Sequence, residues 1–484
     1  MKEKIYEYLN ESIDDVKFSD FSNCINYEKY TKKKKVFPKK IILALGTFIL
    51  IIFSVLVIGL TNKNTNNGSN DDYLLVKASN RLDVESLKIE GDKDYQAFIE
   101  KLEIFSAKLS VAIYLDSDKN ENLCVSPISV YMALAMTIAN STGTAKEELL
   151  NAVGVTEYEV NEFTKYLYSY LKLEKYKKDN YGNEKLASIL DLDNSIWINE
   201  NVKLKQSGLD HLANNFMADS FYAPFSSNNE LANKLMGEYV NEKTRGLINP
   251  QLKLSTDTIF ALVNTLYMKD FWDSEVDEIN YSKDKYEFIS SSGDVVSDYF
   301  LESLYNAGRV FESDSYLQFY VSTDSRYKLK IFIPKDGYDL DDVFTVDNLI
   351  NINKLNDFNI YEEKDNVNII HKTRTIFPKF EASYDNDLVS IFKENFNVSS
   401  IFEPGKHMTG LTDIDNIFVS NIIHKTKLKV DEKGIEGAAV TIVVEGVESV
   451  EMYENHDFII DRAFGYLVTD KYDNIIFTGV VNTI

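Results

Sequence analysis

An uncharged run of 20 residues, Ile41–Leu60, divides this chain into two very unequal parts. At a rise of about 1.5 Å per residue, a helix of about 20 apolar residues spans the roughly 30 Å hydrocarbon core of a bilayer. Seven lysines and no acid lie between Lys29 and Lys40, and the residues just after the run carry a single lysine. This asymmetry predicts a single-pass transmembrane helix with a cytoplasmic amino terminus. The alternative is a cleaved signal peptide, but its apolar core is usually shorter, about 7–15 residues.

The run implies four segments along the chain. We predict a cytoplasmic tail over residues 1–37, a transmembrane helix over 38–60, an extracytoplasmic spacer over 61–93 and one large folded domain over 94–484. The spacer begins with an Asn-, Gly- and Ser-rich stretch, which is typical of a linker. The localisation expected from this division is the cell membrane, with the folded domain extracellular.

Composition excludes several classes of function. A net charge of −24 argues against nucleic-acid binding, which needs a basic surface. The two cysteines, Cys24 and Cys124, would lie on opposite sides of the membrane, so we expect neither a disulfide framework nor a cysteine metal site. No two of the five histidines have metal-ligand spacing on a helix, and no nucleotide-binding, hydrolase or metalloprotease motif occurs. We therefore expect no metal, no cofactor, no catalytic residue and no enzymatic activity.

Helical patterns come early in the large domain and strand patterns come late. Apolar residues recur at helical spacing from Phe98 to Ile113, and Ser126 followed by Pro127 is a favourable start for a second, strongly apolar helix. In residues 422–430, lysines alternate with mostly apolar residues, which predicts a half-buried strand. This order predicts an α+β domain with large mixed or antiparallel sheets.

Six segments of the domain carry motifs in a characteristic order. They are Asn122–Ser129, Asn194–Trp197 with Phe225-Ser226 downstream, Asn241–Ile248, Val263–Lys269 with Trp272, Phe377–Phe380, and Asp431–Ala439. In this order and spacing they resemble the serpins over residues 94–484. The resemblance implies the serpin fold, an α+β domain of about nine helices around three β-sheets with an exposed reactive-centre loop.

The resemblance also implies a function. Inhibitory serpins are suicide substrates: a serine or cysteine protease cleaves the loop, and the loop then inserts into the central sheet with the protease attached. The expected partners are therefore a target protease and, through residues 41–60, a membrane, with the protein a monomer. The alternative is a non-inhibitory serpin that acts as a binding or carrier module.

A segment that enters a packed sheet needs small side chains first, because bulky ones would open the sheet at a steric cost. The resemblance assigns this hinge to Glu432, Gly434, Ile435, Glu436, Gly437, Ala438 and Ala439. The β-branched run Val440–Val444 follows and favours a strand. Side chains that would face inward on insertion are Ile435, Gly437, Ala439, Thr441, Val443, Glu445 and Val447. Taken alone, the segment would equally suit an ordinary exposed loop.

Three features depart from the family pattern. Ile435 stands where inhibitory hinges usually have threonine or serine, Gly437 replaces an alanine, and Ala463 stands where a proline is usual. The first two, together with Glu445, favour the non-inhibitory alternative. Burial of Glu445 would also be costly unless it reaches the solvent end of the sheet.

The remaining site residues follow from the resemblance. Counting the family's usual span from Glu432 puts the reactive bond between Glu448 and Ser449, whereas counting back from Phe464 points to Met452 and Tyr453. The polar cluster beneath the parting strands corresponds to Ser126, Ser129, Asn264 and His424. Lys379 and Glu432 would form an ion pair at the top of the sheet, next to Trp272. His424 is expected to have a structural hydrogen-bonding role, and Cys124 to be a buried thiol.

Overall fold

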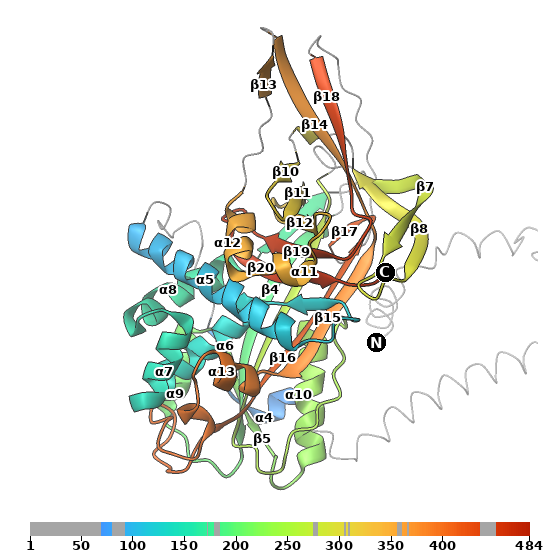
Figure 1. Ribbon diagram of the computed structural model, residues 1–484. Coiled ribbons are helices and arrows are strands. Elements are labelled where there is room, and N and C mark those ends of the chain that lie inside the picture. The colour runs from blue at the N-terminus through green and yellow to red at the C-terminus, as the bar shows by residue number, and fades with distance from the viewer. Residues whose placement is uncertain are drawn as a thin grey trace, which may run out of the picture. The chain divides into compact units, whose positions relative to one another are not determined.

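The computed structural model describes residues 69–79, 92–171, 173–178, 184–273, 279–303, 306–307, 310–355, 361–364, 367–435 and 452–484 (Figure 1). The predicted tail and transmembrane helix lie outside these ranges. Within them, no helix is both long and apolar enough to cross a membrane. The described residues form one unit, which spans Gly68–Ile484.

Two predicted helices form the helical core. Helix α5 (Lys93–Asp116) begins at Asp92, whose side chain accepts hydrogen bonds from the backbone N–H groups of Asp94 and Tyr95. Helix α6 (Pro127–Asn140) buries every residue except Ala139, as its apolar sequence predicts. The other helices are α4 (Asn70–Tyr73), α7 (Gly143–Val153), α8 (Glu157–Tyr170), α9 (Gln206–Asn215), α10 (Asn229–Lys243), α11 (Leu340–Val343), α12 (Val346–Lys354) and α13 (Val389–Asn395).

Most strands belong to one 14-stranded sheet. In spatial order these are β1 (Leu74–Val76), β5 (Ala218–Ala223), β4 (Glu184–Asn199), β6 (Phe260–Phe271), β17 (Gly434–Ile435), β16 (Val419–Asp431), β15 (Phe380–Asp387), β2 (Leu123–Val125), β20 (Ile475–Val481), β19 (Phe464–Thr469), β12 (Lys328–Pro334), β11 (Tyr316–Ser322) and β10 (Phe311–Glu312), with β3 (Leu173–Lys178) beside β4.

A second sheet has six strands. They are β13 (Tyr361–Lys364), β14 (Val367–Phe377), β8 (Val295–Ser303), β7 (Ile279–Ile289), β18 (Met452–Ile459) and β9 (Asn306–Ala307). In Figure 1, β14 and β18 rise together at the top of the view, and their pairing is parallel. Three sheets were expected. The described strands join into two because the short β2 pairs with both β15 and β20 and so links strands that would otherwise form separate sheets.

Part of the predicted spacer is folded onto the domain. Strand β1 pairs antiparallel with β5, with Leu74 opposite Phe221. Just after it, the backbone N–H of Ala78 donates to the Asp219 carboxylate at 2.8 Å. The spacer was expected to stay separate from the domain over 61–93, but a strand edge leaves backbone groups that a neighbouring segment can pair with. The folded unit therefore starts earlier than residue 94.

Strand β6 separates two hydrophobic clusters. Its side chains alternate between the two faces of the sheet, as the strand geometry requires. One face, with Leu262 and Leu266, packs in the large core that includes α6, while Ala261 and Val263 pack in the smaller cluster that includes residues of α10. A strand inserted beside β6 would therefore direct alternate residues into the large core.

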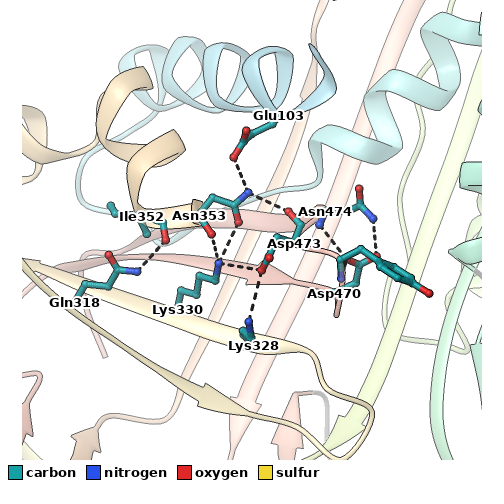
Figure 2. A network of polar contacts seen from close by, with 10 residues as sticks. Glu103, Gln318, Lys328, Lys330, Ile352, Asn353, Asp470, Asp473 and Asn474 are labelled. Carbon is teal, nitrogen blue, oxygen red and sulfur yellow. Dashed lines mark hydrogen bonds and ion pairs between the residues drawn. The ribbon is translucent and has the colours of Figure 1, made fainter. Parts of the chain in front are cut away.

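A buried lysine ties the helices to this core (Figure 2). Lys330 of β12 is fully buried, and its ammonium group donates to Asn353 and, at 3.3 Å, to Asp473. Asn353 in turn donates to Glu103 of α5. Burial lowers the pKa of Lys330 to about 8, and the nearby Asp473 carboxylate partly opposes this. The contacts satisfy an otherwise costly buried cation.

Candidate functional site

The central feature of the site is a parting between β6 and β16. The two strands pair in parallel at their lower ends, from Val419 opposite Phe260 to Ile423 opposite Val263. Above this point they are no longer each other's neighbours. At the upper end β17 lies between them and pairs antiparallel with both. The interval between these two ladders covers 264–269 on β6 and 424–429 on β16.

The hinge strand β17 is tightly fitted at the top of this interval. Gly434 has φ +151°, and a Cβ added there would lie 2.0 Å from the carbonyl oxygen of Asp270. Ile435 is fully buried and pairs with Asp270 on one side and Val430 on the other. The bulky Ile435, a departure from the family pattern, is thus already accommodated within the sheet. Gly434 is required because no side chain fits beside β6 at that position.

The side chain of Asp270 anchors the upper end of β6 through hydrogen bonds. Its buried carboxylate accepts from the Thr323 hydroxyl at 2.6 Å and from the backbone N–H of Ser325 at 3.1 Å. Burial raises the pKa of this carboxyl, and the hydrogen bonds oppose the shift. These contacts hold the strand end against which Gly434 and Ile435 pair. Sequence reasoning did not identify Asp270, because a single acid at a strand end carries no motif.

Polar residues gather at the lower end of the interval. The backbone N–H of Ser126 donates to Nε2 of His424 at 3.1 Å, and Ser129 donates to Asn264. Asn264 donates in turn to Asn194, which donates to the carbonyl oxygen of Phe216 at 2.9 Å. The structure therefore brings together four residues from the predicted cluster, in two hydrogen-bonded pairs beneath the point where the strands part. Asn194 extends the cluster. It lies in one of the six motif segments, but the sequence assigned it no role in the site.

His424 is neutral in this setting. Complete burial lowers its pKa to about 3, so Nε2 can accept the hydrogen bond from Ser126 while Nδ1 carries the proton. Cys124 is also fully buried, and burial raises the pKa of its thiol to about 12. The thiol is therefore protonated and inert at neutral pH, which fits the expected structural role.

Trp272 joins the top of β6 to the hinge. Its indole N–H donates to the carbonyl oxygen of Asp431 at 2.9 Å. Its backbone N–H donates to the carbonyl oxygen of Lys433 at 3.2 Å. The ring packs edge-on against Phe377, with the ring centroids 6.0 Å apart. These contacts fix the turn between β16 and β17.

The expected ion pair between Lys379 and Glu432 is not formed in the described part of the chain. Lys379 instead pairs with Asp298 at 3.7 Å, and Glu432 pairs with Lys433 at 3.8 Å. Tyr281 interacts with both predicted partners: its hydroxyl donates to Glu432 at 2.8 Å, and the Lys379 ammonium lies over its ring, 5.8 Å from the centroid. The prediction of that pair was wrong because Tyr281, which carries no motif, provides alternative contacts for both residues.

The remaining predicted site residues are only partly described. Glu436, Gly437, Ala438 and Ala439 and the reactive bond Glu448–Ser449 lie outside the described residues. Met452 and Tyr453, the alternative bond, begin β18 and pair with Ile369 and Ile370 of β14. The alternative bond therefore lies within a strand.

Comparison with known proteins gives a consistent result. The family described as "Serpin (serine protease inhibitor)" matches residues 100–484. Serpin-Z10 of Arabidopsis thaliana is 26% identical over 377 residues, which cover 74% of this chain and 91% of that protein.

Two solved structures are similar in fold. The native-state structure of tengpin, a thermophilic serpin, has a TM-score of 0.65 at 23% identity and covers 84% of this chain and 98% of its own. The complex of thyroxine-binding globulin with thyroxine has a TM-score of 0.63 at 20% identity, over 80% and 98% of the two chains. With a family match over most of its length, the chain belongs to the serpin family.

Proposed function

We propose that this protein is a membrane-anchored extracellular serpin that inhibits serine or cysteine proteases as a suicide substrate. The observation that carries the proposal is the parting of β6 and β16, with the hinge strand β17 between them at its upper end. The domain that performs this function would be the folded unit that includes residues 94–484.

The register of β17 supports insertion of the residues that follow it. Since Ile435 pairs with Asp270 and Val430, each further loop residue would move one position down both strands. The inward-facing residues, each with its neighbours on β6 and β16, would be Gly437 with Met268 and Leu428, Ala439 with Leu266 and Thr426, Thr441 with Asn264 and His424, and Val443 with Leu262 and Ile422.

Each of these positions suits its neighbours chemically. Gly437 and Ala439 are small where the neighbouring side chains are buried in the large core. Thr441 would arrive at the polar cluster, where the hydroxyl of Ser126 is buried without a partner among the described residues. A polar side chain costs least where it finds a hydrogen-bonding partner. The alternation of small, polar and apolar residues in the loop therefore agrees with the alternation along the interval.

The same register bears on the free-energy cost of burying the Glu445 carboxylate. That residue would lie opposite Phe260, the first residue of β6, and hence at the end of the sheet rather than in its centre. Residues beyond Thr441 would need the parallel ladder between β6 and β16 to open at Val263 and Ile423. Each backbone hydrogen bond lost there would be replaced by bonds to the inserted strand on both sides.

Trapping would use the target's own chemistry. The protease nucleophile attacks the carbonyl carbon of Glu448, the peptide nitrogen of Ser449 leaves with a proton, and an acyl-enzyme remains. Insertion of residues 436–445 would then lengthen the inserted strand by about 33 Å, at about 3.3 Å per residue, and carry the acyl group toward the opposite end of the sheet. This movement would pull the target's active site out of shape before water attacks the ester or thioester.

We favour Glu448–Ser449 over Met452–Tyr453 as the reactive bond. Met452 and Tyr453 pair with β14, whereas a protease binds its substrate as an extended segment that must be accessible. Cleavage after Glu448 implies a target that prefers glutamate. Anchoring through residues 41–60 would confine the inhibitor to the cell surface and its targets to the extracellular side.

A non-inhibitory binding or carrier function is the second candidate. Ile435 favours it, because a bulky residue at the first inward position would slow entry of the loop. Thyroxine-binding globulin, named as a thyroxine complex, is a structural neighbour of similar fold. The full burial of Ile435 between two strands weighs against this candidate, since the most difficult side chain is already inside the sheet.

An assay with a panel of proteases distinguishes the two candidates. The full-length protein is incubated with serine and cysteine proteases of different specificity, and the products are separated in SDS. We expect a covalent complex with a glutamate-preferring protease and a released carboxy-terminal peptide that begins at Ser449. Cleavage of the loop by every protease without any SDS-stable complex would contradict the inhibitory function.

A further inference from the structure

Three potential metal ligands lie together on β18, the strand that follows the reactive loop, and on its neighbour β14. Nδ1 of His371 in β14 lies 3.0 Å from Nε2 of His456 in β18 and 3.8 Å from a carboxylate oxygen of Glu454. One ligand atom from each residue lies within 4.8 Å of the others. No motif or comparison assigns a role to these residues.

The strand register explains why the three side chains meet. In the parallel pair of β14 and β18, His371 is opposite Glu454 and Thr373 is opposite His456. Residues two apart on a strand point to the same face, so the two histidines and the glutamate share one face of the sheet. The sequence criterion of helical spacing could not identify this group, because His371 and His456 are 85 residues apart and lie on neighbouring strands.

The other face of the same two strands is occupied by a different interaction. Arg374 and Asp457 form a two-point ion pair there, with nitrogen–oxygen distances of 3.0 and 2.9 Å. The two strands are thus joined by charged groups on one face and by imidazoles and a carboxylate on the other. Only the second set includes imidazole nitrogens, which suit a transition metal such as zinc.

The ligand chemistry fits zinc. Two imidazoles and one carboxylate form a known ligand set for Zn²⁺, with a fourth position left for water. Bonds of about 2.0–2.1 Å at tetrahedral angles set two nitrogens about 3.3–3.4 Å apart, so the histidines would need to separate by only a few tenths of an ångström. His371 is fully buried, while the Glu454 side chain is 54% exposed, so an ion could enter from the side of Glu454.

We propose that His371, Glu454 and His456 bind a Zn²⁺ ion that fastens β18 to β14. The ion would replace the hydrogen bond between the two imidazoles with three coordinate bonds across the two strands. Because β18 begins at Met452, directly after the reactive loop, the ion would lie close to the carboxy-terminal end of that loop.

The consequence for the loop rests on the proposed function. Insertion of an uncut loop through Glu445 would place that residue about 33 Å below Ile435, whereas the seven residue steps from Glu445 to Met452 span at most about 24 Å. An uncut loop can therefore insert fully only if β18 leaves β14. A cut after Glu448 removes this restraint. Zn²⁺ would accordingly preserve the uncut, active form without hindering the trapping of a protease.

Zinc binding is tested directly on the full-length protein by calorimetric titration with Zn²⁺ and by visible absorption with Co²⁺. We expect one ion per chain, and at least tenfold weaker binding in Glu454→Gln and His456→Gln, which replace the more accessible ligands. His407→Gln, which alters a histidine outside the cluster, should bind as the parent does. The site would be overturned if the parent did not bind Zn²⁺, or if both ligand variants bound it as tightly as the parent does.

The effect on β18 has its own readout. Hydrogen exchange of the backbone amides of β18 is followed in the uncut protein with and without saturating Zn²⁺. We expect Zn²⁺ to slow this exchange in the parent and not in His456→Gln. Binding without any change in exchange would overturn the clamp, and neither measurement depends on whether the protein inhibits a protease.

Discussion

Substitution of Ala439 by arginine tests loop insertion at a single position. In the register continued from β17, Ala439 would face the large core between Leu266 and Thr426, each of which is only 4% exposed. Neither neighbour carries a charge to pair with a guanidinium group there, and an uncompensated buried charge costs about 3–5 kcal/mol. At about 1.4 kcal/mol per factor of ten, Ala439→Arg should slow or reverse insertion roughly a hundred- to several-thousand-fold.

The neighbouring residue provides a matched control. Ala438 would face the opposite side of the sheet, between the buried Tyr267 and Lys427, whose side chain is 37% exposed. Ala438→Arg adds the same side chain and charge on the face where Lys427 reaches solvent, so it should impair insertion far less than Ala439→Arg does.

Thermal unfolding before and after a cut in the loop measures the difference. A protease that cuts the loop without forming an SDS-stable complex is used, and the melting temperatures of cut and uncut protein are compared for the parent and both variants. We expect the cut to raise the melting temperature of the parent and of Ala438→Arg by tens of degrees, and to leave that of Ala439→Arg nearly unchanged. A rise of the same size in Ala439→Arg, or a loss of the rise in both variants, would refute the assignment of inward positions.

Two further predictions follow from the structure and one from the sequence. The pKa of His424 is about 3 in the folded state, below its ordinary value of 6.5, so on acidification the unfolded state binds the proton first. The unfolding free energy of the parent should therefore fall between about pH 6 and pH 4. This fall should be steeper than that of His424→Gln by about 1.4 kcal/mol per pH unit. Equal slopes in urea denaturation would contradict a buried neutral histidine. The pKa of Lys330 is likewise lowered, to about 8 from 10.5, so the parent should gain about 3 kcal/mol relative to Lys330→Met as the pH rises from about 8 to 10.5. A constant difference between the two proteins over this range would show that Lys330 stays charged. For the predicted anchor, protease added outside intact cells should remove the 94–484 domain and leave an epitope at the amino terminus protected; digestion of that epitope would exclude a cytoplasmic tail.

Much of the fold could be predicted from the sequence because the signals are local. The apolar spacing from Phe98 to Ile113 lies within α5, and Ser126 with Pro127 starts α6. The alternation over residues 422–430 corresponds to β16, in which most side chains alternate between buried and partly exposed positions. Helical and strand periods depend on neighbours a few residues away, so they can be read from a single segment. The order of six motifs then identified the family.

The details of the site depend on contacts between distant segments, which local patterns do not contain. The sequence located Glu432 and Lys379 near the top of the sheet, but Tyr281, some 150 residues from Glu432, determines which partners they have. The polar cluster includes Asn194 because β4 lies beside β6, and the expected third sheet is joined to another through β2.

The sequence by itself determined the family and the main helices and strands, while the anchor and the small residues of the hinge stay predictions. Only the tertiary structure decided that β17 pairs with two strands at once, that β6 and β16 part between Val263 and Asp270, and that His371 meets His456. The physical reason is that side-chain periodicity specifies which face of a strand is buried, whereas the register between strands is set by packing of the whole sheet. A shift of one residue in that register would exchange inward and outward positions along the inserted loop.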